Sequence, residues 1–342
     1  MSGSMKKSFC LLLILISLIV ASCEKVSPIE VFVATVAVED RVKMSNLYFK
    51  NHLDGKLWLL AEGDYSFIVG ADSHITTDSG RMDEMLANGL EHDDLFYAHL
   101  GDIADTKAEY YITLDSLLKE AKARYVEKNF IKKDEFHYVY REDTAEDPIT
   151  STYDEILYPF FPVVGNHDVT HNGWALWSNI FHSSFYEIDV IVTLENGEYA
   201  FDHLIFLDSA SATLGATQIE LIRQGILDGA YDDGSSIYRN TFVFTHTNIF
   251  RPQFFEFAST FPREETFFLL DQFEKWNVTC VFCGHVHTWD ERDYNGVHYL
   301  TLDAMSERNN PEPGDYLIRL NVGADGSVDW EPVHMNYTPK KK

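Results

Sequence analysis

The sequence predicts one α/β domain, because apolar segments alternate with helical segments along most of its length. Apolar runs of four to eight residues that end near Gly, Asp or Asn are typical of buried strands, and they occur at 65–69, 95–100, 160–164, 203–207, 241–245, 279–282, 297–302 and 316–321. Helical segments lie between them, at 107–129, 216–227 and 264–276. The second of these places Ile219, Ile222 and Ile226 on one face. Interleaved strands and helices indicate an α/β fold.

The composition describes a globular and strongly acidic protein. The chain has 342 residues, of which 45% are hydrophobic, so it can form a large core. It carries 54 acidic and 27 basic side chains, for a formal net charge of −27. Such a surface repels a long polyanion, so the composition speaks against a nucleic-acid polymer as partner.

The N-terminus has the pattern of an export signal. Lys6 and Lys7 precede an apolar run over 9–21, which is shorter than the roughly 20 residues that span a bilayer. We predict a signal peptide over 1–22. The residues before Cys23 resemble a bacterial lipobox, so we expect cleavage there and lipidation of Cys23. The alternative is a plain signal peptide. The lipobox predicts an extracytoplasmic lipoprotein, at the outer membrane or cell surface rather than the inner membrane.

The remaining chain divides into a lead-in and one domain. We predict an anchor and N-terminal lead-in over 23–60, followed by the domain over 61–335. Within the domain, residues 106–159 form a long insertion that ends in a polar, turn-rich segment. It is either a solvated surface excursion or a lid over the site. Cys280 and Cys283 lie in an apolar strand, so we interpret them as buried structural residues.

Polar clusters follow five of the predicted strands. The carboxyl ends of strands in an α/β sheet meet in one crevice, so clusters that are distant in sequence can meet there. They combine carboxylate, imidazole and amide groups without thiolate, which suits ions such as Mn, Fe or Zn. The clusters are Asp72-Ser73-His74, Gly101-Asp102-Ile103-Ala104-Asp105, Gly165-Asn166-His167-Asp168, Thr245-His246-Thr247 and Gly284-His285-Val286-His287.

Taken together and in this order, the five clusters resemble the calcineurin-like metallophosphoesterase superfamily. Its pattern is D-x-H, G-D-x-x-D, G-N-H-D/E, a lone H and G-H-x-H, and every motif is intact over roughly residues 65–305. The resemblance implies a four-layer α/β/β/α sandwich, in which two mixed sheets are flanked by helices. It also implies a phosphatase or phosphodiesterase that hydrolyses phosphate mono- or diesters with a metal-bridging hydroxide.

The resemblance assigns ligands to two divalent ions, which we expect to be Mn, Fe, Zn or Mg. Asp102 resembles the carboxylate that bridges both ions. The other implied ligands are Asp72, His74 and His287 for one ion, and Asn166, His246 and His285 for the other.

The resemblance also implies catalytic roles next to the metals. His167 resembles the family's histidine that stabilises the phosphoryl oxygens or protonates the leaving group. Asp105 and Asp168 are expected to hold its imidazolium.

Substrate contacts are expected from residues near these motifs. Besides Asn166, we expect His171 and Arg251 to bind substrate, although Arg251 could equally form a surface salt bridge. Trp174 and Trp177 could stack on a base or sugar, or belong to the core. We expect a small phosphorylated substrate, and the sequence leaves the choice between monoester and diester open, together with the oligomeric state. The alternative function is a surface lipoprotein that captures phosphorylated ligands with its metals and does not turn them over.

Overall fold

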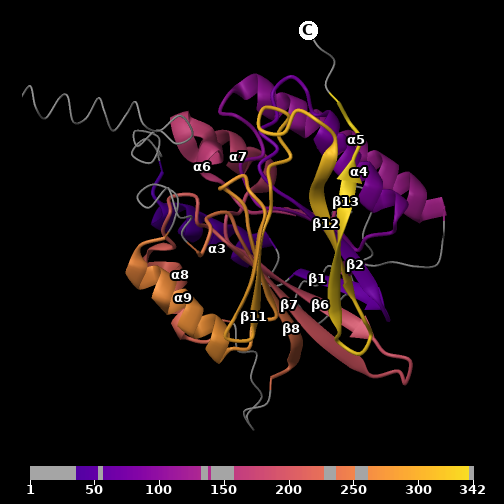
Figure 1. The fold of residues 1–342 in the computed structure, drawn as a ribbon, viewed down its shortest axis with the longest axis vertical. Coiled ribbons are helices and arrows are strands. Elements are labelled where there is room, and N and C mark those ends of the chain that lie inside the picture. The colour runs from indigo at the N-terminus through magenta and orange to yellow at the C-terminus, as the bar shows by residue number, and fades with distance from the viewer. Residues whose placement is uncertain are drawn as a thin grey trace, which may run out of the picture.

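Two mixed β-sheets flanked by helices form the structure, a computed structural model that describes residues 36–52, 57–131, 138–139, 158–226, 236–250 and 261–338 (Figure 1). The predicted α/β class and its two-sheet arrangement are therefore confirmed. One sheet has eight strands in the order β10-β11-β9-β8-β7-β6-β1-β4, and the other has five in the order β13-β12-β2-β3-β5.

The strands of the larger sheet are β1 Leu57–Glu62, β4 Tyr138–Val139, β6 Tyr186–Thr193, β7 Tyr199–Leu207, β8 Tyr238–Thr245, β9 Cys280–Cys283, β10 Asp290–Tyr294 and β11 Val297–Thr301. Those of the smaller sheet are β2 Tyr65–Gly70, β3 Phe96–His99, β5 Phe160–Pro162, β12 Gly314–Val322 and β13 Val328–Met335. The described helices are α3 Val38–His52, α4 Gly80–Glu91, α5 Ala108–Ile131, α6 Asn166–Val169, the short 3-10 turn η2 Thr170–Asn172, α7 Gly173–Phe181, α8 Gly215–Arg223 and α9 Arg263–Lys275.

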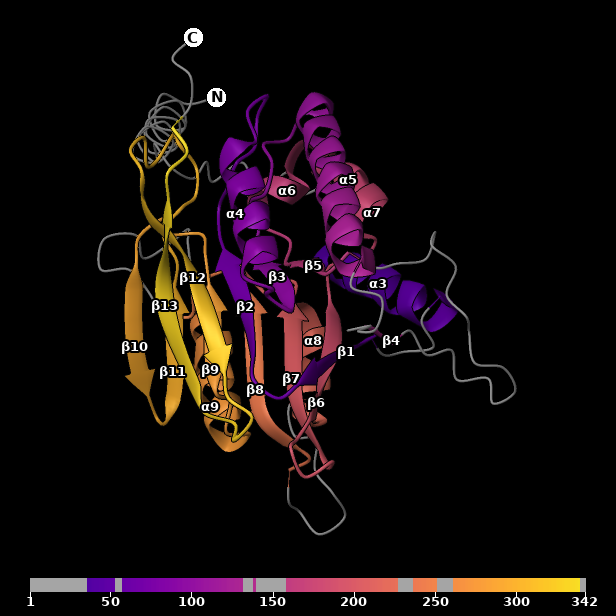
Figure 2. The same cartoon turned by 90° about the vertical axis from the view of Figure 1, so that its right-hand side faces the viewer.

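Three apolar clusters join the layers. The sheets face each other through rings that include Phe67 of β2 and Phe244 of β8, both fully buried. Helices α4, α5 and α7 pack on the outer face of the smaller sheet, and α3, α8 and α9 pack on that of the larger sheet. Figure 2, turned by 90°, shows α4 and α5 beside β2 and β3. The result is a helix–sheet–sheet–helix sandwich.

Parallel strands in both sheets end at one edge of this sandwich. In the smaller sheet β2, β3 and β5 are parallel neighbours, and in the larger sheet β7, β8, β9 and β11 are. The five polar clusters follow β2, β3, β5, β8 and β9, so strand direction alone carries them to the same edge.

The body of the protein begins before residue 61, the predicted start of the domain. Helix α3 and strand β1 come from the segment that we predicted to be a lead-in. β1 pairs in parallel with β6, and Arg41 of α3 is fully buried against Asp208. Buried charge–charge contacts of this kind belong to a domain, and a linker would leave Arg41 in solvent.

The predicted insertion begins as the 24-residue helix α5, and β4 pairs with β1 on the edge of the larger sheet. Most of its polar segment lies outside the described residues, and so do the predicted signal peptide and Cys23. Within the described part of the chain, no helix combines the length and the apolar character needed to cross a membrane.

Candidate metal centre

The loops after the five strands bring all seven predicted metal ligands together. They form two groups of donor atoms that share one residue, Asp102. The ligands come from both sheets: β2, β3 and β5 position the residues from 72 to 166, whereas β8 and β9 position those from 246 to 287. The site therefore exists only when the two sheets are packed.

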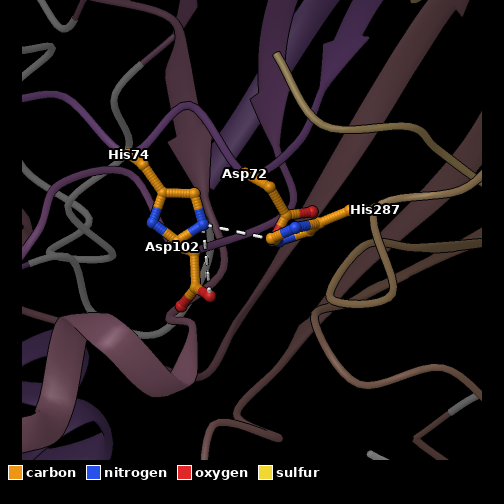
Figure 3. A group of neighbouring side chains, drawn as sticks. All are labelled: Asp72, His74, Asp102 and His287. Atoms are coloured by element: carbon orange, nitrogen blue, oxygen red, sulfur yellow. Dashed lines mark hydrogen bonds and ion pairs between the residues drawn. The ribbon is translucent and has the colours of Figure 1, made fainter. Parts of the chain in front are cut away.

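The first group contains Asp72, His74, Asp102 and His287, whose side chains converge in Figure 3. Nε2 of His74 lies 3.4 Å from Nε2 of His287 and 3.9 Å from Oδ2 of Asp102. Nε2 of His287 lies 3.2 Å from Oδ1 of Asp72. Donors about 2.1 Å from one ion lie roughly 3.0–3.5 Å apart in octahedral or tetrahedral arrangements, so this group fits a divalent cation.

The second group contains Asp102, Asn166, His246 and His285. Nε2 of His246 lies 2.9 Å from Oδ1 of Asn166, 3.1 Å from Nδ1 of His285 and 3.5 Å from Oδ2 of Asp102. The same Asp102 oxygen thus faces both groups, while its Oδ1 accepts the backbone N–H of His167 at 2.7 Å. That is the arrangement a bridging carboxylate requires.

The burial and ionisation of the carboxylates and imidazoles at this site favour binding of a cation. Asp72 is fully buried, and its Oδ1 accepts no hydrogen bond of ordinary geometry within the described residues. Burial opposes the ionisation of Asp72 and Asp102, but neighbouring histidines outweigh it and lower the pKa of both; the largest opposing charge comes from His287 for Asp72 and from His246 for Asp102. Burial, with the charge of His246 second, lowers the pKa of His285 to about 3. Ionised carboxylates and neutral imidazoles are the forms that bind metals.

The backbone is strained at most of the candidate metal ligands. Asp72, His74, Asp102, His285 and His287 have φ angles of 51°, 43°, 51°, 72° and 52°. Left-handed backbone in residues other than glycine costs of order 1–3 kcal/mol each and clusters at functional sites. The fold thus holds five of the seven candidate ligands in a left-handed backbone conformation, which residues other than glycine rarely adopt.

Gly165 permits the close packing of two of these loops. A Cβ at this position would lie 2.1 Å from the backbone nitrogen of Asp102 and 2.2 Å from its Oδ1. A side chain would therefore displace the shared carboxylate, which explains why glycine precedes Asn166 in the third motif.

His167 and Asp105 lie at the exposed side of the first group. The rings of His167 and His74 meet edge to face at 4.8 Å. Oδ1 of Asp105 lies 3.1 Å from Nδ1 of His74 and 3.8 Å from Nδ1 of His167. Asp105 therefore hydrogen-bonds a ligand and forms a longer ion-pair contact with His167. Burial raises the pKa of Asp105, but the hydrogen bond from His74 and the charges of His74, His167 and Arg308 lower it overall.

The structure gives Asp168 a different role from the one we predicted. Its oxygens accept the backbone N–H groups of Gly165 at 2.8 Å and Ile103 at 3.1 Å, and the Tyr111 hydroxyl at 3.1 Å. Consecutive residues of the short helix α6 point in different directions, so Asp168 faces inward while His167 faces the site. Through these hydrogen bonds Asp168 ties the second motif to the third.

The residues that we predicted to contact substrate differ in their exposure to solvent. His171 is exposed to solvent and follows α6 with a left-handed φ of 47°. Trp174 and Trp177 are 3% and 0% exposed and belong to the core beneath α7, so stacking on a substrate is excluded for both in this conformation. Arg251 lies outside the described residues. Cys280 and Cys283 are buried free thiols, as expected.

The sequence motifs missed Arg308 and Asn309, on the loop between β11 and β12. The Asn309 amide contacts Nδ1 of His287. Arg308 is exposed and lies close enough to Asp105 to lower its pKa. Within the described residues Arg308 has no acidic partner within salt-bridge distance, whereas most arginines do. The only signal in the sequence is an Arg-Asn-Asn run that follows the last motif by some twenty residues.

Comparison with solved structures shows a similar fold in proteins of very different sequence. GAP50, the anchor in the inner membrane complex of Plasmodium, matches with a TM-score of 0.50 and 11% identity, over 82% of this chain and 90% of that chain. What is shared is the fold. A dimetal phosphatase from Danio rerio matches with a TM-score of 0.40 and 10% identity, over 81% of this chain and 100% of that chain. A predicted phosphoesterase from Streptococcus pneumoniae gives 0.31 and 12%, over 80% and 100%. No protein-family model and no curated protein sequence matches the chain.

Proposed function

We propose that this protein is a metal-dependent phosphoesterase that hydrolyses phosphate mono- or diesters at a binuclear centre. The observation that carries the proposal is the position of Asp102, whose Oδ2 faces both donor groups. One group supplies Asp72, His74 and His287, and the other supplies Asn166, His246 and His285. This donor set contains no thiolate, and it suits Mn, Fe, Zn or Mg.

Two bound divalent ions would polarise the phosphoryl oxygens and lower the pKa of the attacking water. The chain's own residues supply the rest. His167 lies at the exposed side of the first group, in the position for a proton donor to the leaving oxygen, and Asp105 steadies its protonated form from 3.8 Å. No side chain needs to act as a nucleophile.

Arg308 supplies a cation for substrate binding. Its guanidinium is exposed beside Asp105, and no acidic side chain of the described residues pairs with it. Arginine binds phosphate oxygens in a fork geometry. We assign it to a non-bridging oxygen of the ester, a role for which the sequence first suggested Arg251.

The charge of the site selects for a small substrate. Two divalent cations would outweigh the carboxylates of Asp72 and Asp102, so the pocket would be locally positive inside a protein of net charge −27. A long polyanion would meet the acidic surface around the pocket, whereas a small phosphate ester would not.

Hydrolysis of nitrophenyl phosphate and of its bis-ester tests this function. The protein is stripped with a chelator, and Mn, Zn or Mg is added back singly. We expect metal-dependent release of nitrophenol from at least one ester, and the preferred ester separates phosphatase from phosphodiesterase. Bound metal without turnover of either ester, together with saturable phosphate binding, would favour the alternative, a surface protein that captures phosphorylated ligands.

We further propose that the chain is exported and anchored to a membrane through a lipid on Cys23. The support is the sequence pattern around Cys23. Membrane fractions of cells that express the full chain test it: Cys23→Ser should move the protein to the soluble fraction. Membrane association that survives this change would contradict the anchor.

A further inference from the structure

The loop over 303–313, which joins β11 to β12, is bonded to the backbone of the first motif. The Met305 N–H donates to the carbonyl of Ala71 at 2.9 Å, and the Ser306 N–H donates to that of Asp72 at 3.1 Å. The loop therefore runs along the backbone of Ala71 and Asp72.

Two side chains fix the shape of the loop. The buried guanidinium of Arg81, from α4, donates to the carbonyls of Met305 and Glu312, both at 2.8 Å. The amide of Asn310 donates to Oδ1 of Asp303 at 3.0 Å and to the carbonyl of Ala304 at 2.7 Å. Both ends of the loop are thus held, and the turn at 307–309 has a defined position beside the metal centre.

At the tip of this turn, the amide nitrogen Nδ2 of Asn309 contacts Nδ1 of His287. The opposite edge of the same ring presents Nε2 to Oδ1 of Asp72, at 3.2 Å, and to Nε2 of His74, at 3.4 Å. The two ring nitrogens of His287 therefore face different partners: Nε2 faces the first donor group, and Nδ1 faces Asn309.

In two other histidines of the site, Nε2 likewise faces the donor groups while Nδ1 faces a hydrogen-bond acceptor. His246 directs Nδ1 to the carbonyl oxygen of Leu100 at 2.7 Å, and His74 directs Nδ1 to the carboxylate of Asp105 at 3.1 Å. A histidine that binds a metal through Nε2 carries its proton on Nδ1 and donates it to an acceptor, which fixes the tautomer and the ring orientation. His287 needs such an acceptor, and the Asn309 side chain is placed at its Nδ1.

We propose that Asn309 is the positioning residue for His287: its amide oxygen accepts the Nδ1–H of the imidazole and holds Nε2 toward the first metal position. A half-turn of the terminal amide brings Oδ1 to Nδ1 without moving the backbone, because the oxygen and nitrogen occupy equivalent places. The inference rests on the proposed binuclear centre, and it extends that centre to a loop outside the five motifs.

Metal titration of two substitutions at this position tests the proposal. Asn309→Leu keeps the volume of the side chain and removes the acceptor, whereas Asn309→Asp keeps the acceptor. Stepwise binding of Co²⁺ to the metal-free full-length protein is followed by calorimetry and by the visible absorption of the bound ion. We expect Asn309→Leu to weaken one of the two ions by about 10- to 100-fold and to leave the other within a few-fold. Asn309→Asp should bind both ions about as tightly as the wild type.

A loop variant separates positioning from general loop structure. Asn310→Leu removes the contacts to Asp303 and Ala304 but leaves the acceptor at His287, so its Co²⁺ affinities should fall less than those of Asn309→Leu. Thermal unfolding of each metal-free variant verifies that it is folded.

Three results would overturn the proposal. Wild-type affinity in Asn309→Leu would show that His287 needs no acceptor from this residue. Equal weakening in Asn309→Leu, Asn309→Asp and Asn310→Leu would show that the loop acts by packing alone. Absence of Co²⁺ binding by the wild type would refute the binuclear centre itself, and the first two results are distinguishable from it because the wild type still binds two ions.

Discussion

Buried aspartates occur in two kinds of surroundings in this protein. Asp94 and Asp202 are fully buried in their side chains, and each is bound by an arginine through two nitrogens: Arg319 for the first and Arg239 for the second. Asp208 is bound in the same manner by Arg41. Asp72 and Asp102 are equally buried, yet their hydrogen-bond and ion-pair partners within the described residues are histidines and backbone N–H groups, with no arginine among them.

This difference separates structural carboxylates from functional ones. A buried charge requires a partner, and removing that partner costs several kcal/mol. Where the fold supplies an arginine, its guanidinium neutralises the carboxylate and occupies the place that a metal ion would take. Where it supplies imidazoles around a shared carboxylate oxygen, a divalent cation would complete the arrangement. Asp168 is an intermediate case, because backbone N–H groups and Tyr111 satisfy it in place of any cation.

The largest expected effect comes from Asp102→Asn. The amide keeps the shape but removes charge from both metal positions, so we expect metal content to fall well below two ions per chain. Turnover of the preferred nitrophenyl ester should fall by about a thousandfold or more, since loss of a single electrostatic contact can cost 10²–10³. Elemental analysis and steady-state kinetics measure the two effects. Retention of both metals and of the rate would show that Asp102 is not a shared ligand.

The next effect concerns a residue beside the metals. His167→Ala should lower kcat by about 10²–10⁴, the usual contribution of a general acid or base, while two metals remain bound. His334→Ala is the matched control, because that imidazole is exposed, lies on β13 outside the five motifs and pairs with Asp315 of β12. Loss of metal from His167→Ala would instead identify His167 as a ligand.

Asp94→Asn tests a buried aspartate that is paired with an arginine. It leaves Arg319 buried without its carboxylate, so the free energy of unfolding should fall by about 3–5 kcal/mol. Asp94 lies before β3, at the opposite end of that strand from Asp102, so metal content and kcat of the folded fraction should not change. Urea unfolding measures the stability. A metal-free Asp102→Asn protein provides the contrast: its carboxylate has no arginine partner, so the free energy of unfolding should fall less than in Asp94→Asn.

The smallest effect is a pH dependence of stability that involves His99. This histidine is 1% exposed in β3, and burial lowers its pKa to about 3. The unfolded chain binds a proton near pH 6.5 and the folded chain does not, so stability is present above that pH and is lost as the pH falls toward 3. The loss reaches about 1.4 kcal/mol per pH unit for one such group. His99→Phe should flatten this acid slope relative to the wild type and to His334→Gln, in urea unfolding of the metal-free proteins. An unchanged slope would show that His99 takes up a proton without unfolding.

The central strands and the convergence of the candidate metal ligands could be predicted because each depends on a local pattern. Continuous apolar runs mark strands that are buried on both faces, and the polar motifs follow them directly. The strands β6, β10 and β13 were missed because charged residues interrupt or replace their apolar positions; those of β10 and β13 are mostly exposed, whereas in β6 Glu187 is half-buried and Asp189 is buried. Helix α3 was missed because its packing depends on the buried pair of Arg41 with Asp208, 167 positions away in sequence.

Roles that depend on side-chain direction could not be predicted. Asp168 is adjacent to His167 in sequence, but a turn of helix α6 directs it away from the site. Asn309 lies outside the motifs, and only the packing of the 303–313 loop on the Asp72 backbone brings it to His287.

The most direct test of the binuclear centre is a crystal structure of the protein grown with Mn²⁺, with anomalous scattering measured at the manganese edge. We expect two peaks about 3.5–4 Å apart, with Asp102 between them, one near His74 and His287 and the other near His246 and His285. A single peak, or peaks that do not contact Asp102, would contradict the binuclear centre.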